Sequence, residues 1–134
     1  MKDYYIGEIL SNLTGTDEEK TVAFNAIKDL VEDDIHTICI IVAATEITDP
    51  VAVVEIANNL DSYSVEFSIH NDSDLGKFWI KYICNDENSI LNKYRYYIDY
   101  NLLAKDLLTT GIGEITPYGM LWYPDFCFYR NAFM

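Results

Sequence analysis

The chain has 134 residues, of which 50% are hydrophobic and 14% aromatic, and this composition excludes an intrinsically disordered protein. Its 22 acidic residues against nine lysines and arginines give a net charge of −13, which excludes direct binding to the phosphates of a nucleic acid. The longest apolar run, residues 38–44, is far shorter than the roughly 20 residues that a membrane-spanning helix needs.

The first half of the chain is predicted to be helical. Residues 16–19, Thr-Asp-Glu-Glu, fit a capping box, so a helix is expected to begin near Thr16. Residues 35–46 fit either a helix or a buried strand, because their apolar spacing is helical but residues 40–42 are all β-branched. Asp49 followed by Pro50 is typical of a helix start, so a further helix is expected there.

The character of the chain changes at Ser62. Residues 63–70 alternate between apolar and polar side chains, which predicts a half-buried strand. Asn71 is expected to cap a helix whose inner face contains Leu75 and Trp79. Residues 85–89 are then expected to form a loop.

A second helix and a hairpin are predicted after this loop. Asp99 is expected to cap the helix, which ends at residues 109–111. Residues 112–116 and 120–123 are predicted to pair as strands through a turn that contains Gly119.

Together these elements predict an α+β fold. We expect an acidic helical sub-domain over residues 1–61 and an α+β sub-domain over residues 62–134. The second sub-domain should consist of a small antiparallel sheet with two packed helices.

Acidic residues are concentrated where basic ones are missing. Residues 1–66 hold fourteen acids and three bases, whereas residues 67–134 hold eight acids and six bases. No Lys or Arg occurs between Lys28 and Lys77, an interval with eleven carboxylates. A high net charge can serve solubility alone, but ordinary surfaces intersperse both signs. The acidic interval therefore also fits a surface that binds a basic partner.

Residues that could carry catalysis or bind a metal are few and scattered. The three cysteines, Cys39, Cys84 and Cys127, show no zinc-binding spacing and are expected to be reduced thiols in a cytoplasmic protein. His36 lies three residues before Cys39, but this spacing alone does not make a catalytic pair. Residues 72–74 lack the remaining oxygen ligands of a calcium loop, so helix capping is favoured there. We expect no catalytic site, no metal and no cofactor.

Two segments of the second half carry a resemblance to a known family. They are residues 67–76, Phe-Ser-Ile-His-Asn-Asp-Ser-Asp-Leu-Gly, and residues 97–107, Tyr-Ile-Asp-Tyr-Asn-Leu-Leu-Ala-Lys-Asp-Leu, followed by the hairpin through Gly119. Residues 62–123 thereby resemble the C-terminal region of ArdA-type antirestriction proteins, in which a Tyr-Ile-Asp-Tyr segment precedes a short helix ending in Asp-Leu. More loosely, the acidic helices from Thr16 onward resemble the acidic helical middle of that family. The chain is shorter than members of that family, and we expect it to lack the family's N-terminal β-containing module.

The resemblance implies a function that fits the charge. ArdA-type proteins are acidic dimers encoded on mobile genetic elements, and they evade host defence. Their carboxylates imitate the phosphates of bent B-form DNA and occupy the DNA-binding channel of type I restriction–modification enzymes. B-form DNA carries about one charge per 1.7 Å of axis. Acids three or four residues apart on a helix lie about 5–6 Å from one another, so acidic helices suit such mimicry.

The predicted functional residues form two groups. The first group consists of carboxylates expected to contact the basic partner: Glu32, Asp33, Asp34, Glu46, Asp49, Glu55, Asp61, Glu66, Asp72 and Asp74. The second group consists of aromatic residues expected at a homodimer interface: Trp122, Tyr123, Phe126 and Phe128, with Tyr97 and Tyr100 added by the resemblance. For the last thirteen residues, packing of a terminal strand in the core is an equally open interpretation.

Three functions remain open from the sequence. The first is a DNA mimic that inhibits a type I restriction–modification enzyme. The second keeps the mimicry but directs it at an RNA-guided CRISPR effector, which also has a cationic nucleic-acid channel. The third is an adaptor or regulatory protein that is not a mimic and whose aromatic tail docks a partner. Each of these binds a protein, and none involves a membrane or direct contact with nucleic acid.

Overall fold

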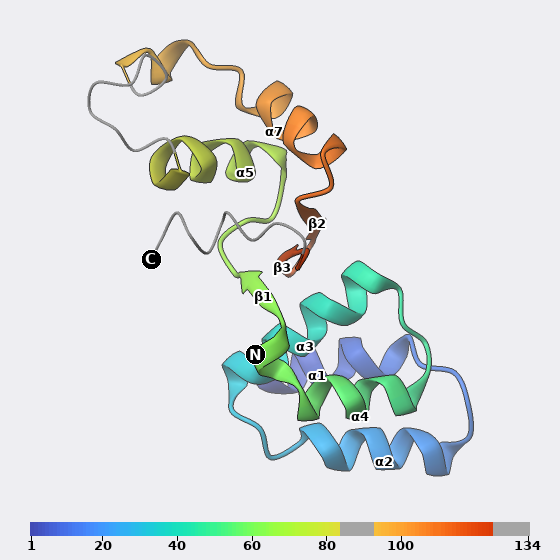
Figure 1. Cartoon of the computed structure of the whole chain (residues 1–134). Helices are drawn as coiled ribbons and strands as arrows, with labels where there is room; N and C mark the ends of the chain where they lie inside the picture. The colour runs from blue at the N-terminus through green and yellow to red at the C-terminus, as the bar shows by residue number, and fades with distance from the viewer. Residues whose placement is uncertain (84–92, 125–134) are drawn as a thin grey trace. The chain divides into compact units, whose positions relative to one another are not determined.

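The computed structural model describes residues 1–83 and 93–124 (Figure 1). The chain divides into two compact units, Met1–Val65 and Glu66–Met134. We call them the N-terminal unit and the C-terminal unit. The division falls inside strand β1 (Ser64–Glu66), slightly after the boundary expected between Asp61 and Ser62.

The N-terminal unit is built from helices. Helix α3 packs against α1 and α4, and α2 packs against α4, so the apolar faces of all these helices share one core. A short 3₁₀ turn follows α4 and contacts α3. The elements are α1 (Lys2–Ser11), α2 (Asp17–Ile27), α3 (Glu32–Thr45), α4 (Pro50–Asn58) and η1 (Leu60–Ser62).

Helix α3 resolves the open assignment of residues 35–46 in favour of a helix that ends at Thr45. Its isoleucine and valine side chains, which are β-branched, are buried in the core of the unit. The helix penalty of such residues is below about 0.7 kcal/mol each, and burying each side chain contributes more than that. The buried residues of α3 are Ile35, Ile38, Cys39, Ile40, Ile41 and Val42.

Helix α1 was not predicted from the sequence. It buries Ile6 and Ile9, and Leu13 is buried just after its end. These three positions follow the helical spacing of three and four residues, so the periodicity was present but short.

The helix starts follow the predicted capping chemistry. Thr16 Oγ1 accepts a hydrogen bond from the backbone N–H of Glu19 at 3.2 Å, and Glu19 Oε1 accepts one from the N–H of Thr16 at 3.1 Å. Asp49 Oδ1 accepts a hydrogen bond from the N–H of Val51 at 3.0 Å, with Pro50 in the first turn. Both predicted helix starts are therefore confirmed.

The C-terminal unit combines helices with a small sheet. The strand order is β1-β3-β2, and β2 and β3 pair antiparallel with Gly113 opposite Trp122 and Thr116 opposite Gly119.

Asn71 and Asp99 cap α5 and α7 as predicted, by accepting hydrogen bonds from Asp74 N–H and Leu102 N–H. The elements are α5 (Asp72–Phe78), the π-helical turn η2 (Trp79–Ile83), η3 (Arg95–Tyr97), α7 (Tyr100–Thr109), β2 (Gly113–Thr116) and β3 (Gly119–Trp122). The α+β class is confirmed, while the loop expected at residues 85–89 lies outside the described residues.

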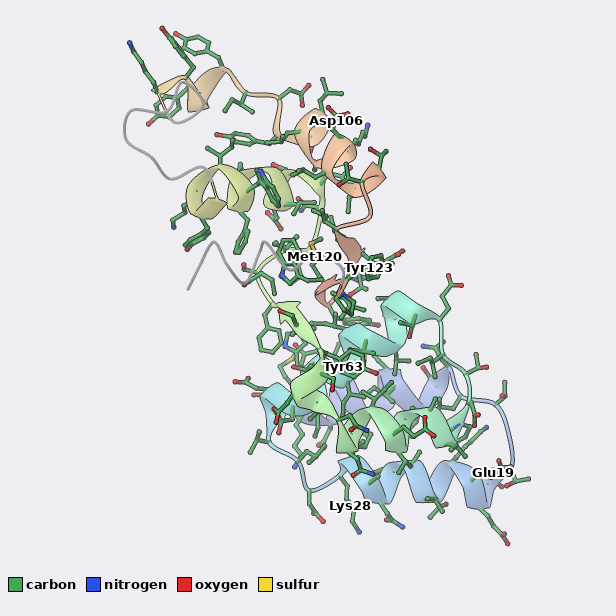
Figure 2. All side chains as sticks on the ribbon, in the orientation of Figure 1. Glu19, Lys28, Tyr63, Asp106, Met120 and Tyr123 are labelled. Atoms are coloured by element: carbon green, nitrogen blue, oxygen red, sulfur yellow. The ribbon has the colours of Figure 1, made fainter. Side chains whose placement is uncertain are left out.

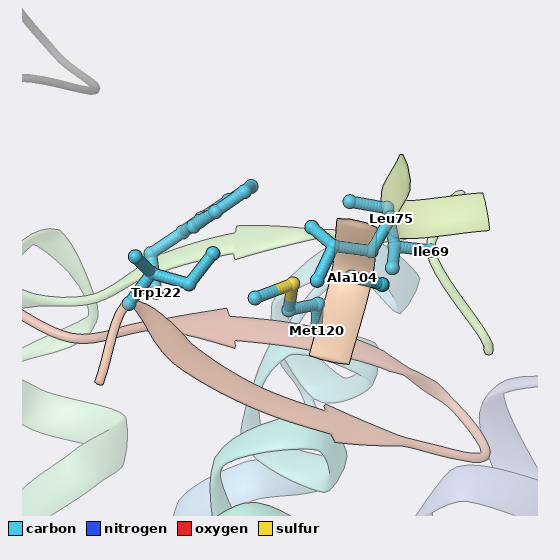
Figure 3. Close-up of a cluster of buried hydrophobic side chains, with 6 residues drawn as sticks. Ile69, Leu75, Ala104, Met120 and Trp122 are labelled. Atoms are coloured by element: carbon cyan, nitrogen blue, oxygen red, sulfur yellow. The ribbon is translucent and has the colours of Figure 1, made fainter. Parts of the chain in front are cut away.

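One core cluster joins the helices of this unit to its sheet (Figure 3). Helices α5 and α7 pack closely, because Gly76 on α5 lies against the backbone of Tyr100. A Cβ atom at position 76 would lie 2.9 Å from Tyr100 Cα, a distance that real Cβ atoms essentially never show. The buried residues of the cluster are Ile69, Leu75, Ala104, Ile112, Met120 and Trp122.

The strand predicted over residues 63–70 is shorter in the structure. Strand β1 ends at Glu66, whose carboxylate accepts hydrogen bonds from Ser68 N–H at 3.3 Å and Ser68 Oγ at 2.8 Å. These bonds stabilise a turn at residues 67–68. Hydrogen bonds from polar side chains to the nearby backbone commonly compete with strand pairing in this way.

Candidate functional site

The predicted carboxylates separate by exposure according to their unit. Those of the C-terminal unit, Glu66, Asp72 and Asp74, are half-buried. Asp34 is the half-buried one among those of the N-terminal unit. The remaining six are exposed, and we call them the exposed acidic set: Glu32, Asp33, Glu46, Asp49, Glu55 and Asp61.

Three consecutive acids form the first turn of α3. Glu32, Asp33 and Asp34 follow Val31, which is the N-cap and supplies no side-chain hydrogen bond among the described residues. The first turn of a helix carries a partial positive charge, so acids are stabilised there without a basic side chain beside them. Glu32 Oε1 also lies 3.6 Å from the amino nitrogen of Met1.

Asp34 and Asp61 line one surface hollow. Helix α3 contacts the 3₁₀ turn η1, and this contact brings the two carboxylates to the same concave region of about 360 Å³. Apart from Leu60, the other lining residues are polar or small, and all come from the end of α4 and from η1: Ala57, Asn58, Asn59, Leu60 and Ser62. Two residues far apart in the sequence therefore contribute negative charge to one surface.

Glu46, Asp49 and Glu55 lie at the end of α3 and along α4. Glu46 follows α3 with a φ of 55°, the left-handed region that non-glycine residues rarely adopt. Asp49 also has a structural role, because its side chain caps α4. Glu55 is exposed on α4, and its side chain makes no hydrogen bond or ion pair within the described residues.

Basic side chains do not neutralise this surface. Within residues 1–83 and 93–124, no Lys or Arg nitrogen lies within ion-pair distance of the exposed acidic set. The N-terminal unit has three lysines, and Lys20 and Lys28 both lie on or next to α2. The electrostatic potential is therefore negative over the helices that carry the exposed acidic set.

The carboxylates of the C-terminal unit have local partners. Glu66 binds Ser68, and Asp74 Oδ2 accepts a hydrogen bond from the backbone N–H of His70 at 3.0 Å. Asp72 lines a polar hollow of about 530 Å³ together with His70 and Lys105. Glu66 and Asp74 thus accept local hydrogen bonds, whereas Asp72 faces this hollow.

Sequence reasoning treated the acids of α2 as capping residues and omitted them from the site. Asp17 and Glu18 are exposed in the first turn of α2, and Glu19 is exposed while it completes the capping box. The hydrogen bonds from Thr16 hold the pKa of Glu19 below its usual range. The signal for including these residues was their density, three acids in succession.

The predicted dimer residues fall in different environments. The placement of Trp122 is a correction: it is 3% exposed in the core of the C-terminal unit, so its indole is not available to a second chain. Tyr97 is 86% exposed, whereas Tyr100 is half-buried with its ring 5.9 Å from Lys77 Nζ. Tyr123 is half-buried and donates a hydrogen bond to Glu114 Oε2 at 2.8 Å, which raises its pKa. The remaining two, Phe126 and Phe128, lie outside the described residues.

The thiol of Cys39 is unsuited to nucleophilic catalysis. Burial raises its pKa to about 12, and the negative charge of Glu8 adds to this effect, so the reactive thiolate is scarce near neutral pH. The ring of His36 stacks on Tyr5 with centroids 4.3 Å apart. Among residues 1–83 and 93–124, no three His, Cys, Asp or Glu side chains are grouped so that they could hold a metal ion.

No described helix combines the length and the apolar composition needed to cross a bilayer. In comparisons with known proteins, no family model, no curated protein and no solved structure matches this chain.

Proposed function

We propose that this protein is a DNA mimic that occupies the DNA-binding channel of a type I restriction–modification enzyme and thereby inhibits cleavage. It acts in the cytoplasm of the host cell and carries out no reaction of its own. Its partner is a basic DNA-binding protein, and its contact surface is the exposed acidic set with Asp34 beside it.

One observation carries the proposal. Six exposed carboxylates of the N-terminal unit have no basic side chain within ion-pair distance among the described residues. Clustered like charges destabilise a compact fold, so an arrangement of this kind costs stability. That cost favours a role for the charges in binding. A cationic channel supplies the missing counter-charges from outside.

Enzymes that bind DNA derive much of their affinity from Lys and Arg contacts to phosphates and from release of counterions. A surface of carboxylates can use the same contacts. It offers no base edges to read, so it competes whatever sequence the enzyme recognises. This physical argument supports mimicry of DNA in general, and the sequence resemblance to ArdA-type proteins favours a type I restriction enzyme as the target.

The test is an inhibition assay with a variant that removes charge and keeps shape. The variant is Asp33→Asn, Asp34→Asn, Glu46→Gln, Glu55→Gln and Asp61→Asn; it leaves the helix cap Asp49 and the Met1 contact of Glu32 intact. At about 0.5 kcal/mol for each exposed charge contact, five losses weaken inhibition roughly sixtyfold. DNA cleavage by a purified type I enzyme is measured against inhibitor concentration.

The matched control exchanges the same residues while it conserves their charge: Asp33→Glu, Asp34→Glu, Glu46→Asp, Glu55→Asp and Asp61→Glu. We expect this variant to inhibit within a few-fold of the wild type, because a distributed field depends on charge more than on side-chain length. Equal inhibition by the neutralised variant would refute the mimic. So would complete loss of inhibition on a single substitution, since that outcome indicates a discrete pocket.

The same titration with a guide-loaded CRISPR effector identifies the target class. Inhibition of the effector alone would assign the mimicry to that system. If neither enzyme is inhibited, and binding to a partner is insensitive to salt, the adaptor function replaces the mimic.

A further inference from the structure

The N-terminal unit also has an apolar groove on its surface. The N-terminal halves of α2 and α4 enclose a concave region of about 230 Å³, which we call the α2–α4 groove. Helices α2 and α4 lie side by side in Figure 1, and Figure 2 labels Glu19 at the end of α2 where the groove lies. The lining residues are Glu19, Val22, Pro50, Val51 and Val54.

Two valines give this groove its apolar surface. Val22 on α2 is 59% exposed and Val51 on α4 is 55% exposed. Single exposed apolar residues are common, but here two of them line one hollow together with the less exposed Pro50 and Val54. Covering this surface removes apolar area from water and is favourable.

Carboxylates flank the groove. Glu19 lines it directly, and Glu18 lies four residues before Val22 on the same helix face. On the other helix, Glu55 lies four residues after Val51, one turn further along the same face. Lys20 lies one residue after Glu19 and two residues before Val22, so it faces away from the side of α2 that lines the groove.

We propose that the α2–α4 groove binds one apolar side chain of a cationic helical segment of the partner protein. A volume of about 230 Å³ is below the roughly 300–1,000 Å³ of small-molecule sites, so it suits a single anchoring side chain. Lys or Arg residues one helical turn to either side of that anchor meet Glu18, Glu19 and Glu55. Charge complementarity thus selects a basic amphipathic helix over an acidic or a purely apolar one.

The inference rests on the proposed function only for the positive charge of the partner. Mimicry of DNA requires charge alone, whereas the groove adds an apolar contact that salt does not screen. Partner binding should therefore retain a salt-insensitive part, and this part should reside at Val22 and Val51.

The test uses synthetic helical peptides and the intact chain. The first peptide carries lysines and one row of leucines at helical spacing; the second replaces the leucines with alanine, and the third replaces the lysines with glutamine. We expect the first to bind at least tenfold more tightly than either of the others, as measured by isothermal titration calorimetry or fluorescence anisotropy. Equal binding by the alanine peptide would overturn the apolar anchor, and equal binding by the glutamine peptide would overturn the cationic partner.

Variants of the chain supply the second arm. Val22→Ser with Val51→Ser should weaken binding of the first peptide about tenfold, while Val31→Ser should leave it unchanged. Val31 is a matched control, because it is 64% exposed and does not line the groove. Serine and valine have similar helix propensities at positions 22 and 51, and serine is favoured at position 31, the N-cap of α3, so circular dichroism should show that both variants fold. Equal peptide affinity in the two variants would overturn the proposal.

Light scattering separates a partner from a second copy of this chain. If the wild-type mass fell on Val22→Ser and Val51→Ser substitution, the groove would belong to self-association and the cationic partner would be wrong. The outcome of the cleavage assay does not affect these measurements, so failure of the DNA mimic and failure of the groove are distinguishable.

Discussion

The two units of this protein differ in what their acidic residues do. The N-terminal unit holds thirteen acids against three bases, a net charge of −10, and six of its predicted carboxylates are exposed with no Lys or Arg within ion-pair distance in the described part of the chain. The C-terminal unit holds nine acids against six bases, a net charge of −3, and its Glu66, Asp74 and Asp99 bind backbone N–H groups. These three acids of the second unit thus support the fold, while most of the first unit's set contributes surface charge.

The units also differ in how tightly their elements approach. In the N-terminal unit, isoleucine side chains of α3 fill the core where α3 packs against α1 and α4. In the C-terminal unit, Gly76 lets the backbones of α5 and α7 meet, and Gly113 lies against the backbone of Leu121. A packing that depends on glycine tolerates added atoms poorly. This contrast predicts where the molecule is most sensitive to substitution.

The largest expected effect is that of Gly76→Ala. The new methyl group would meet Tyr100 O and Tyr100 Cα, which are backbone atoms and cannot move without separating α7 from α5. We expect a loss of about 2–3 kcal/mol in the free energy of unfolding of the C-terminal unit. Both tryptophans, Trp79 and Trp122, belong to this unit, so tryptophan fluorescence reports its unfolding in denaturant.

Gly7→Ala is the matched control in the other unit. Gly7 lies on α1, and no described atom lies within 4 Å of where its Cβ would stand. Alanine should stabilise that helix by about 0.5–1 kcal/mol and leave the tryptophan transition in place. If Gly76→Ala were as stable as the wild type, the close approach of α5 and α7 would not be a constraint on the fold.

The next effect concerns self-association, which we expect to use the C-terminal unit because the charge of the N-terminal unit is repulsive. We predict a homodimer in which Tyr97, 86% exposed, contributes to the interface. Tyr97→Ser should raise the dimer dissociation constant about tenfold, a loss of about 1.4 kcal/mol, as measured by analytical ultracentrifugation.

Tyr4→Ser serves as the control for this substitution, because Tyr4 is 49% exposed on the acidic N-terminal unit. It should leave the dissociation constant unchanged. A wild-type mass of one chain at micromolar concentration would contradict the dimer, and an equal effect of both substitutions would contradict the assignment of its interface.

Features that depend on neighbouring residues were predictable from the sequence, and features that depend on packing were not. The caps at Thr16, Asp49 and Asp99 follow from local hydrogen-bonding chemistry, and each is present. The helical state of residues 35–46 depends on contacts of α3 with α1 and α4, which no local pattern contains. The short helix α1 offered too few periodic positions to be recognised.

The candidate site divides in the same way. The absence of bases between Lys28 and Lys77 is visible in the sequence. Of the seven carboxylates that it led us to expect at the surface of the N-terminal unit, six are exposed. Whether an acid has a local partner depends on the turn around it, as Glu66 shows by binding Ser68. Trp122 has an aromatic side chain suited to an interface, but the pairing of β3 with its neighbours turns it into the core.

The smallest expected effect tests whether any acid of the N-terminal unit supports its fold. Glu19 is the candidate, since its carboxylate accepts hydrogen bonds from Thr16 N–H and Thr16 Oγ1, and these bonds lower its pKa below the usual range of a glutamate. A carboxylate whose pKa is lowered by folding stabilises the folded state at pH values above its unfolded pKa. This contribution is lost as the pH falls through the lower pKa of the folded state. Thr16→Ala should cost about 1 kcal/mol at neutral pH through loss of the N-cap side chain.

Glu19→Gln separates the hydrogen bond from the titration. Glutamine can still accept the bond from Thr16 but carries no titrating proton, so this variant should remain close to wild type at neutral pH and lose part of the decline in acid. The thermal midpoint followed by circular dichroism between neutral pH and about pH 3 measures the difference. Glu18→Gln removes the same charge from the same turn, where the described structure gives it no bond to Thr16, and should keep the wild-type decline. If Glu18→Gln and Glu19→Gln changed the acid decline equally, Glu19 would act through net charge alone, and the N-terminal unit would hold its surface acids without using this one to fold.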